Sequence, residues 1–304
     1  MNSGILLVDK PQGITSHDVV ARVRRAAGTR KVGHAGTLDP LATGLLVLGV
    51  DSSTRLLTFL VGLDKTYEAT IRLGVGTTSD DSDGDVVRVV DASGLEAAAV
   101  DAGVAALTGE ISQVPTTVSA IKVGGRRAYD LAREGVEVEL AARQVTISEF
   151  AVTDRRAAVH VADDGAETPV LDLDVRVRCS SGTYVRALAR DLGAGLGVGG
   201  HLTALRRTSV GPFDVSRASV LEGIDVAPAL LRPTEVAELL FPVWRMSAEQ
   251  SVDLGHGKKV AVDLDDTAGP LAAVTPAGDL AGLVSVTGGR ARPIVNFPSD
   301  EVRA

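Results

Sequence analysis

The segment from Gly33 to Gly44 constrains the fold more than any other part of this sequence. It reads GHAGTLDPLATG, so glycines and a proline surround one carboxylate, Asp39, between two apolar stretches. Glycine permits backbone conformations and close approaches that other residues do not, and Pro40 restrains the residue before it to an extended conformation. The pattern predicts a shaped loop, over about 29–43, that presents Asp39 as a nucleophile is presented, although Asp-Pro also occurs in ordinary turns.

The elements around this loop alternate between strand and helix patterns. A helix is predicted from Thr15 or Ser16 to Ala27, with valines at helical spacing inside it and Gly28 at its end. Strands are predicted at 5–8, 45–50, 67–73, 145–152, 170–179 and 202–210. Further helices are predicted at 54–60, capped by Ser52, and at 95–107, 127–133 and 183–196. This order indicates a mixed α/β domain.

The last part of the chain has a different character. Three prolines interrupt it between 228 and 242, and the apolar runs that follow are short and separated by Gly, Pro and Asp. We therefore predict a domain boundary near residue 243. An α/β domain would span 1–242. A small all-β barrel would span 243–304, with strands near 271–274, 280–286 and 293–297.

The composition is that of an ordinary soluble globular protein, with 45% hydrophobic and 23% charged residues. No stretch approaches the ~18–20 apolar residues of a transmembrane helix, and the apolar run at 5–8 is too short for a signal sequence. Cys179 is the one cysteine, so no intrachain disulfide can form. Neither CxxC nor HExxH occurs, and the five histidines have no paired spacing. We expect a cytoplasmic protein without metal and without membrane contact.

The charge of the chain is unevenly distributed. A net charge of −8 by itself argues against nucleic-acid binding, because phosphate contacts need clustered Lys and Arg. Residues 1–35, however, hold six basic and two acidic side chains, whereas residues 261–304 hold three basic and six acidic ones. This difference fits one RNA-facing surface on an acidic protein, and it equally fits ordinary variation of charge along a chain.

Two other patterns resemble known binding sites but fail in their context. Residues 195–200 match GxGxxG, yet a dinucleotide site needs a strand before this loop and a helix after it. Because a predicted helix precedes it here, a helix-terminating loop is favoured over a nucleotide site. The aspartates around Gly84 lack the terminal Glu of a calcium loop, since Val90 stands in its place. A polar loop with a carboxylate that supports a nearby site fits this segment better.

The loop around Asp39 resembles the GHxGxLDPxAxGxL signature of the pseudouridine synthase family that contains the bacterial tRNA pseudouridine-55 synthases. Four other blocks of that family occur in the family's order. They are LVDKPQG at 7–13, DKTY at 64–67, CSSGTYVR at 179–186 with DLG at 191–193, and LRR at 205–207. Together the matches cover nearly all of residues 4–211. The sequence departs from the family at 113–122, where the second proline and the aromatic residue of a Pro-Pro-x-(Tyr/Phe)-Ser-Ala-x-Lys block are missing.

The resemblance implies a fold and a domain organisation. The catalytic domain over 1–242 would be built around an antiparallel-rich mixed sheet, and residues 113–144 would form an insertion that grips RNA. Points of similarity at 254–257 and 282–284 imply that residues 243–304 form a PUA-like RNA-binding barrel.

The resemblance also implies roles at the centre of the site. Asp39 would be the catalytic aspartate, and Arg186 would pair with it. Tyr67 would stack on the target uracil and act in proton transfer. Tyr184 and Leu205 would line the pocket for the base.

A second group of residues would hold the rest of the RNA. His34 would fill the gap in the RNA stack that the extruded nucleotide leaves. Lys10 and Arg207 lie in matched blocks and are assigned to substrate binding, and so is Lys122 in the insertion. The basic residues around 22–31 would contact phosphates.

The implied reaction is the isomerisation of uridine to pseudouridine at position 55, in the T-loop of tRNA, by a monomer that contacts the T-arm and needs no cofactor. A relative in the same family modifies rRNA within a guide-RNA complex; this chain has no long basic extension for such an assembly, which favours a stand-alone tRNA enzyme. Two alternatives from other classes remain. One is a non-catalytic RNA-binding or tRNA-folding protein on the same scaffold, and the other is a small-molecule enzyme that binds a nucleotide at 195–200.

Overall fold

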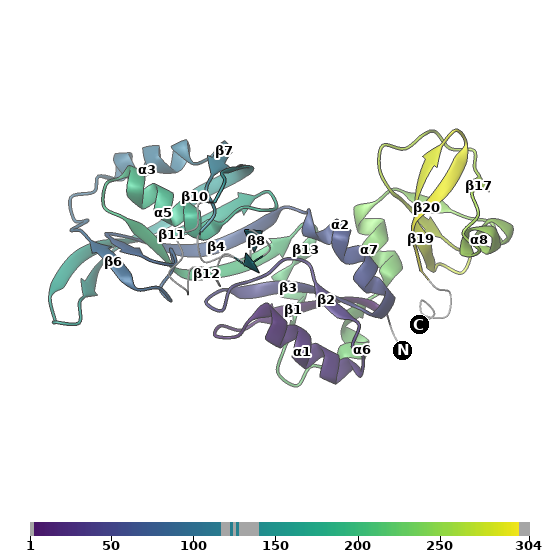
Figure 1. Ribbon diagram of the computed structural model, residues 1–304, viewed down its shortest axis with the longest axis horizontal. Coiled ribbons are helices and arrows are strands. Elements are labelled where there is room, and N and C mark those ends of the chain that lie inside the picture. Colours follow the sequence, from purple (N-terminus) through teal and green to yellow (C-terminus); the bar gives the residue numbers. More distant parts are fainter. Residues whose placement is uncertain (1–2, 117–121, 124–125, 128–139, 298–304) are drawn as a thin grey trace. The chain divides into compact units, whose positions relative to one another are not determined.

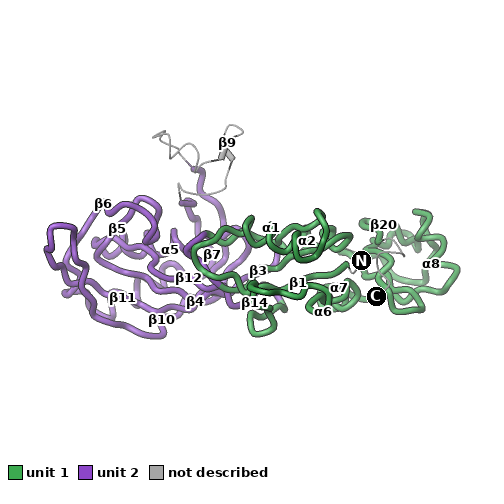
Figure 2. The backbone as a smooth tube through the Cα atoms, turned by 90° about the horizontal axis from the view of Figure 1, so that it is seen from below, with its two compact units in different colours: residues 1–39, 44–61, 212–304 green, residues 40–43, 62–211 purple. Residues whose placement is uncertain are grey.

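The computed structural model describes residues 3–116, 122–123, 126–127 and 140–297 (Figure 1). The chain packs into two compact units (Figure 2). The first unit consists of residues 1–39, 44–61 and 212–304, and the second of residues 40–43 and 62–211.

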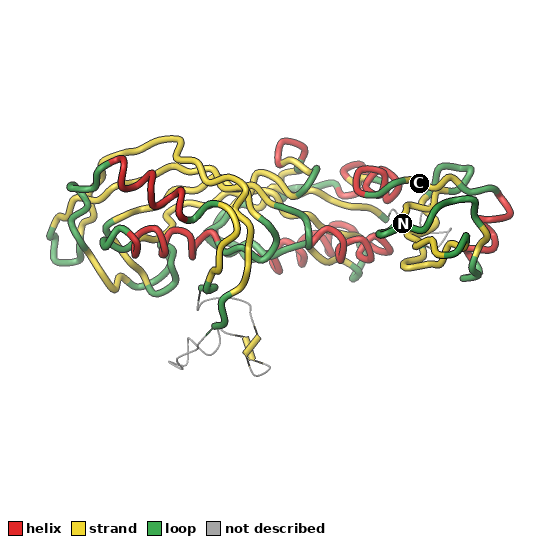
Figure 3. Tube along the Cα trace, turned by 90° about the horizontal axis from the view of Figure 1, so that it is seen from above, coloured by secondary structure: helices red, strands yellow, loops and turns green. Residues whose placement is uncertain are grey.

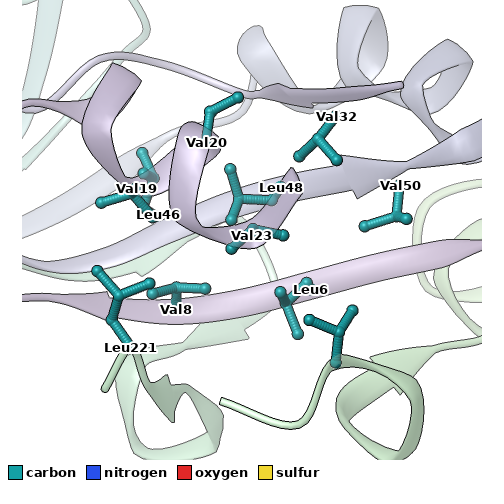
Figure 4. Close-up of a cluster of buried hydrophobic side chains, with 11 residues drawn as sticks. Leu6, Val8, Val19, Val20, Val23, Val32, Leu46, Leu48, Val50 and Leu221 are labelled. Carbon is teal, nitrogen blue, oxygen red and sulfur yellow. The ribbon is translucent and has the colours of Figure 1, made fainter. Parts of the chain in front are cut away.

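The first unit contains a small sheet centred on β1 (Gly4–Lys10). Strand β3 (Thr43–Val50) pairs antiparallel with β1 over the whole length of β1, and β2 (Val32–His34) pairs with β3. Two short strands complete it, β14 (Ser219–Val220) parallel to β1 and β15 (Leu230–Leu231) antiparallel to β1. The short elements β13 (Phe213–Asp214) and η2 (Val215–Arg217) precede β14 in the chain, and α6 (Val226–Ala229) lies between β14 and β15. Aliphatic side chains from β1, β2, β3 and helix α1 (Ser16–Ala27) form the core of this layer (Figure 4).

Helix α1 begins and ends where the sequence predicts. The Thr15 hydroxyl accepts a hydrogen bond from the Asp18 backbone N–H, and the Asp18 carboxylate accepts one from the Thr15 backbone N–H. This reciprocal arrangement is a capping box. Gly28 ends the helix with φ +64°, a left-handed conformation that favours glycine. Val19, Val20 and Val23 are buried on one side of the helix, as their spacing predicts (Figure 4).

The helix predicted over 54–60 with Ser52 as its cap is wrong at its start. The chain instead forms a 3₁₀ helix, η1 (Asp51–Leu56), followed by the short α2 (Leu57–Val61). The Ser52 hydroxyl lies 2.7 Å from the Ser3 hydroxyl and does not cap a helix. Asp51 begins the turn with φ +51° and its carboxylate accepts a hydrogen bond from Thr29.

The second unit contains a longer, fully antiparallel sheet in the order β12, β4, β11, β10, β7. The strands are β12 (Gly200–Val210), β4 (Lys65–Leu73), β11 (Glu167–Cys179), β10 (Arg143–Val161) and β7 (Gly109–Gln113). Helices α3 (Ala97–Ala106) and α5 (Val185–Gly195) pack together and against the strands of this sheet (Figures 1 and 3). A hairpin of β5 (Val75–Thr77) and β6 (Val86–Val89) follows β4, with the loop 78–85 between its strands.

The predicted strands of the second unit are confirmed, and β10 and β11 extend further than predicted. The strand predicted for β10 ended at residue 152, because residues 153–161 are largely exposed on both faces and lack the alternation of a half-buried strand. They pair with the first residues of β11 as a long hairpin. The antiparallel-rich mixed sheet expected for the catalytic part of the chain is therefore confirmed.

The C-terminal residues form a five-stranded sheet of their own. Its order is β16 (Val243–Arg245), β18 (Leu271–Val274), β19 (Leu280–Thr287), β20 (Arg290–Asn296) and β17 (Val260–Ala261). Helix α7 (Pro233–Leu240) precedes it, and α8 (Ala248–Gly255) packs on its strands. The sequence did not predict α8, although Ser247 and Gln250 form a capping box at its start. The first unit contains this sheet as well as residues 1–39 and 44–61, so the boundary at 243 stays a prediction.

Most of the predicted insertion lies outside the described residues. Of 113–144, the structure describes 113–116, 140–144 and a two-residue pairing of β8 (Lys122–Val123) with β9 (Arg126–Arg127). The helix predicted over 127–133 therefore falls outside the described part, apart from Arg127 in β9. Among the described residues, no helix combines the length and apolar character needed to cross a bilayer.

Candidate active site

The segment that presents Asp39 connects β2 to β3; Asp39 belongs to the first unit, and residues 40–43 belong to the second. His34 pairs with Leu48 across these strands, and the Ala35 N–H donates to the Val47 carbonyl at 2.9 Å. The loop therefore begins after His34 and is shorter than the predicted 29–43. Gly36 and Gly44 adopt φ +100° and +96°, the conformations for which the sequence pattern indicated glycine.

Ser16 fixes the backbone next to Asp39. Its hydroxyl donates to the Leu38 carbonyl at 3.0 Å and accepts from the Leu38 N–H at 2.8 Å. Ser16 is completely buried at the first turn of α1, and Leu38 is buried as well. Asp39 itself is half-buried. The Ser16 side chain of α1 thus fixes the position of the backbone directly before Asp39. The sequence pattern did not reveal this role.

His34 and Lys10, both assigned to RNA contacts, occupy different surroundings in the first unit. His34 is half-buried on β2, and its ring meets the His17 ring of α1 edge-to-face at 5.7 Å. Lys10 is fully buried, and its Nζ donates to the carbonyls of Pro11 (2.9 Å) and Ile14 (2.7 Å). Lys10 therefore stabilises the turn that leads into α1, and its contact with substrate stays a prediction.

Tyr67 lies in the middle strands of the second unit. It is buried on β4, opposite Val177 of β11 and Arg207 of β12. Directly opposite residues of an antiparallel pair project to the same face of a sheet, so Tyr67 and Arg207 share a face. Leu205, on the same strand as Arg207, is half-buried opposite Ala69. β4 and β12 thus bring Tyr67 together with two residues, Leu205 and Arg207, that come much later in the sequence.

A buried lysine stands on the same strand as Tyr67. Burial, together with the positive charge of Arg207, lowers the pKa of Lys65 to about 8. Its register partner on β11 is Cys179, and burial raises the pKa of that thiol to about 11. Lys65 belongs to the matched block at 64–67, which is the signal in the sequence that could have indicated it.

Arg186 is held by the loop 78–85 of the same unit. Its Nη1 donates to the Ser79 carbonyl at 2.7 Å and lies 3.2 Å from Asp81 Oδ2. Both side chains of this ion pair are 5% exposed. The Asp81 carboxylate also accepts from the Ser79 hydroxyl and the Asp83 N–H. The sequence predicted a supporting carboxylate in this acidic loop but not which one; the pairing of Arg186 with Asp39 stays a prediction.

Asp80, which lies between Ser79 and Asp81 in this loop, has an unusual backbone conformation and a shifted pKa. It adopts φ +61°, which non-glycine residues rarely do. Burial raises the pKa of its carboxyl to about 6, against the opposing effect of Arg190 and Arg186. Arg190 lies 3.2 Å from Asp80 Oδ2. Two arginines of α5 therefore hold three consecutive residues of one loop.

The backbone of Tyr184, at the start of α5, is held by Gln113 at the end of β7. The Tyr184 N–H donates to Gln113 Oε1 at 2.9 Å, and Gln113 Nε2 donates to the Tyr184 carbonyl at 3.1 Å. Tyr184 is half-buried and Gln113 is buried. Because 71 residues separate them, no local pattern could have indicated this pair.

The remaining candidate sites are simpler. The loop 195–200 follows α5 and leads into β12, so a helix does precede it, and the N–H groups of Val198 and Gly199 donate to the Gly193 carbonyl. This is the helix-terminating loop that the sequence favoured. Lys122 belongs to β8, and its side chain lies outside what the structure describes. In the described ranges, no three His, Cys, Asp or Glu side chains are grouped as metal ligands would be.

Comparison with known protein families gives matches along almost the whole chain. Residues 24–185 match the TruB family pseudouridylate synthase N-terminal domain. Residues 186–244 match the tRNA pseudouridylate synthase B C-terminal domain, and residues 241–298 match the tRNA pseudouridine synthase II C-terminal domain.

Individual relatives are similar over their full length. The chain is 55% identical to the tRNA pseudouridine synthase B of Leifsonia xyli subsp. xyli and 52% identical to that of Arthrobacter sp., in both cases over 99% of each chain. A solved H/ACA ribonucleoprotein bound to a substrate RNA containing 2′-deoxyuridine has the same fold, with a TM-score of 0.68 and 22% identity. That match covers 99% of this chain and 87% of the other.

Proposed function

Because this chain belongs to the TruB family of pseudouridylate synthases, we propose that it isomerises uridine to pseudouridine in tRNA, at position 55 of the T-loop. The observation that carries the proposal is the identity of more than half of all residues, end to end, with proteins named tRNA pseudouridine synthase B. Position 55 rests on the signature around Asp39. We further propose that the protein acts as a monomer on the T-arm, in the cytoplasm, and without a cofactor.

The reaction exchanges one glycosidic bond for another. The bond between C1′ and N1 breaks, the uracil turns, and a bond between C1′ and C5 forms. The hydrogen at C5 leaves as a proton and N1 gains a proton, so no electrons are gained or lost and no water is consumed. The protein must therefore supply a group that assists cleavage, a means to hold the detached base, and a route for the proton.

Asp39 is the group we assign to bond cleavage. Its carboxylate would attack the sugar or the base, or stabilise positive charge at C1′. Its setting supports this role, because the Ser16–Leu38 hydrogen bonds fix the adjacent backbone and leave the carboxylate on a half-buried loop. A group held in this way meets its substrate with little reorganisation.

Arg186 is the group we assign to the charge of Asp39. A guanidinium beside a carboxylate favours the ionised form and fixes its orientation. Arg186 is itself buried against Asp81 and the Ser79 carbonyl. A guanidinium offers five N–H donors in a planar fork, so one nitrogen can be anchored by Asp81 and Ser79 while the group still faces another carboxylate.

Tyr67, Tyr184 and Leu205 are assigned to the base. A uracil removed from its stack costs roughly a few kcal/mol, and stacking on an aromatic face offsets about 1–3 kcal/mol of this. Tyr67 supplies that face and a phenol that can carry a proton. Leu205, on the strand next to Tyr67, supplies an apolar wall. Tyr184 would close the pocket.

The rest of the RNA would be held by residues outside the pocket. His34 is assigned to the gap that the extruded nucleotide leaves in the RNA stack. The basic residues of 22–31, on and after α1, are assigned to phosphates, together with Lys122. Lys10 and Arg207 are also assigned to substrate; both are buried, so they would act through the backbone and side chains that they support.

The test is the substitution Asp39→Asn, which keeps the size of the side chain and removes its charge. We expect tritium release from tRNA labelled with [5-³H]uridine to fall by several powers of ten in single turnover, because a covalent or electrostatic contribution is lost. Binding of the tRNA should persist. Asp163→Asn, the same change in the exposed turn between β10 and β11, is the control and should release tritium at the wild-type rate.

Two outcomes would each contradict a part of the proposal. If the wild-type protein binds tRNA and releases no tritium, the chain is an RNA-binding protein and not an enzyme. If Asp39→Asn releases tritium at the wild-type rate, another group performs the chemistry. Sequencing of pseudouridine sites in tRNA from cells that lack the protein would test position 55.

A further inference from the structure

The start of helix α5 has no cap of its own and is instead held from outside the helix. Tyr184 occupies the N-cap position, and no side-chain cap forms within the helix. The first N–H groups of a helix have no partner inside it. Gln113 binds both backbone groups of Tyr184 with its single amide, at 2.9 and 3.1 Å. This bidentate contact fixes the residue from which α5 begins, two positions before Arg186.

Arg190 holds the same helix one turn later. Its three nitrogens bind three different partners: Nε donates to Asp191 Oδ1 (2.9 Å), Nη1 to Asp80 Oδ2 (3.2 Å) and Nη2 to the Val114 carbonyl (2.7 Å). Val114 directly follows Gln113. The end of β7 and the first residue after it are therefore tied to α5 at two points, by Gln113 and by Arg190.

These contacts converge on Arg186. Residues four apart on a helix lie on the same face, so Arg190 is the neighbour of Arg186. Arg190 binds Asp80, and Arg186 binds the residues on either side of it, Ser79 and Asp81. A shift of Asp80 is carried directly into these two contacts of the Arg186 guanidinium, because adjacent residues share their peptide bonds.

We infer that Gln113 and Arg190 are positioning residues for Arg186, which together fix helix α5 and the loop 78–85 against the end of β7. Neither residue has an assigned contact with the substrate. They act on the reaction by holding the guanidinium where the catalytic carboxylate needs it. The inference rests on the proposed function of Arg186, and it concerns which residues give that arginine its position.

The geometry of Arg190 suggests a discriminating variant. Arg190→Lys keeps the positive charge and the aliphatic stem, but a single ammonium cannot reproduce a planar fork with three separated nitrogens. Arg88→Lys is the matched control, because the Arg88 guanidinium also donates to a backbone carbonyl in this unit, that of Gly197 at 2.6 Å. Arg88 is exposed on β6 and contacts neither Arg186 nor loop 78–85 in any of the described hydrogen bonds.

The measurement is single-turnover tritium release at saturating tRNA, with the Kd for tRNA and the thermal unfolding midpoint measured in parallel. Displacing a reacting group by ~1 Å costs about 100-fold in rate, so we expect a loss of ~10- to 100-fold in Arg190→Lys and in Gln113→Leu. The Kd should change by less than about 3-fold, a shift of no more than ~0.7 kcal/mol. Arg88→Lys should match the wild type in both quantities.

The double variant tests whether the two residues act through the same helix. Contacts that hold one element are coupled, so the combined loss should be smaller than the product of the two single losses. A product of independent losses would contradict the shared role. If the wild-type protein is active and Arg190→Lys keeps the wild-type rate, or changes only the Kd, the inference is overturned and the proposed function stands. An inactive wild-type protein would instead overturn the proposed function itself.

Discussion

The hydrogen bonds of Ser16 predict that one buried hydroxyl affects both stability and catalysis. Ser16→Ala removes the partner of two buried backbone groups, the N–H and the carbonyl of Leu38. A buried polar group left without its partner costs ~1–3 kcal/mol. Two such groups, relieved in part by relaxation of the loop, give an expected loss of about 2–4 kcal/mol in the free energy of unfolding.

The same substitution should slow the reaction. Leu38 is adjacent to Asp39, so freedom in the Leu38 backbone moves the carboxylate. A misplacement of ~1 Å is expected to lower the single-turnover rate at saturating tRNA by about 100-fold. The affinity for tRNA should stay within a few-fold of the wild type, because the basic residues of α1 are unchanged.

Ser3→Ala is a control that also removes a buried hydroxyl bonded to one backbone carbonyl and one backbone N–H; this hydroxyl additionally lies 2.7 Å from the Ser52 hydroxyl and 2.8 Å from the Ser53 hydroxyl. The buried Ser3 hydroxyl donates to the Val50 carbonyl at 3.0 Å and accepts from the Ser53 N–H at 2.9 Å. Both variants should lose stability, measured by urea unfolding, but only Ser16→Ala should lose rate. If the two variants lost rate equally, or if Ser16→Ala kept the wild-type rate despite its lower stability, the positioning argument for Asp39 would be refuted.

Two further predictions concern the second unit. Tyr67→Phe keeps the aromatic face and removes the phenol, so single-turnover rates should fall by ~10²–10⁴-fold with little change in Kd, whereas Tyr67→Leu should also weaken binding; a wild-type rate in Tyr67→Phe would exclude proton transfer by this residue. The second prediction follows from the raised pKa of Asp80, about 6 in surroundings that include Arg186, Arg190, Asp81 and Asp191. Because the folded state holds this proton more tightly than the unfolded state does, the stability it contributes is full below about pH 4 and is lost as the pH rises through about 6. The free energies of unfolding of the wild type and of Asp80→Asn, measured in urea between pH 4.5 and 7.5, should therefore diverge with rising pH, with the variant becoming relatively more stable. A difference in free energy that stays constant with pH would contradict the assignment.

Local signals predicted the elements that local chemistry determines. Helix α1 was predictable because its cap, its apolar face and its terminating Gly28 all lie within a few residues of the helix. The start of η1 was not, because the hydroxyl of Ser52, which looked like a helix cap, lies against Ser3, which is 49 positions earlier in the chain and directly precedes the neighbouring strand β1. The same limit applied to His34, which the glycine-rich pattern placed in a loop and which pairs with Leu48 in a strand.

The candidate site divides along the same line. The signature residues Asp39, Tyr67 and Arg186 could be named from the sequence because their blocks match a family. The residues that hold them could not, since Gln113 lies 71 positions from Tyr184 and Ser79 lies 107 positions from Arg186. The acidic loop was recognised as a polar segment that supports a site, but only the structure identifies Asp81 as the ion-pair partner.

The two contacts proposed to position Asp39 and Arg186 have a feature in common. Ser16 binds the backbone of the residue before Asp39, and Gln113 binds the backbone of the residue two before Arg186. A hydrogen bond to the main chain fixes the position of the neighbouring Cα and consumes none of the lone pairs or N–H donors of the reacting side chain. Such support costs the carboxylate no hydrogen-bonding capacity toward the substrate, whereas support through the carboxylate itself would have to be broken during the reaction. This is why we expect substitutions of these supports to lower the rate at saturating tRNA and to leave affinity nearly unchanged.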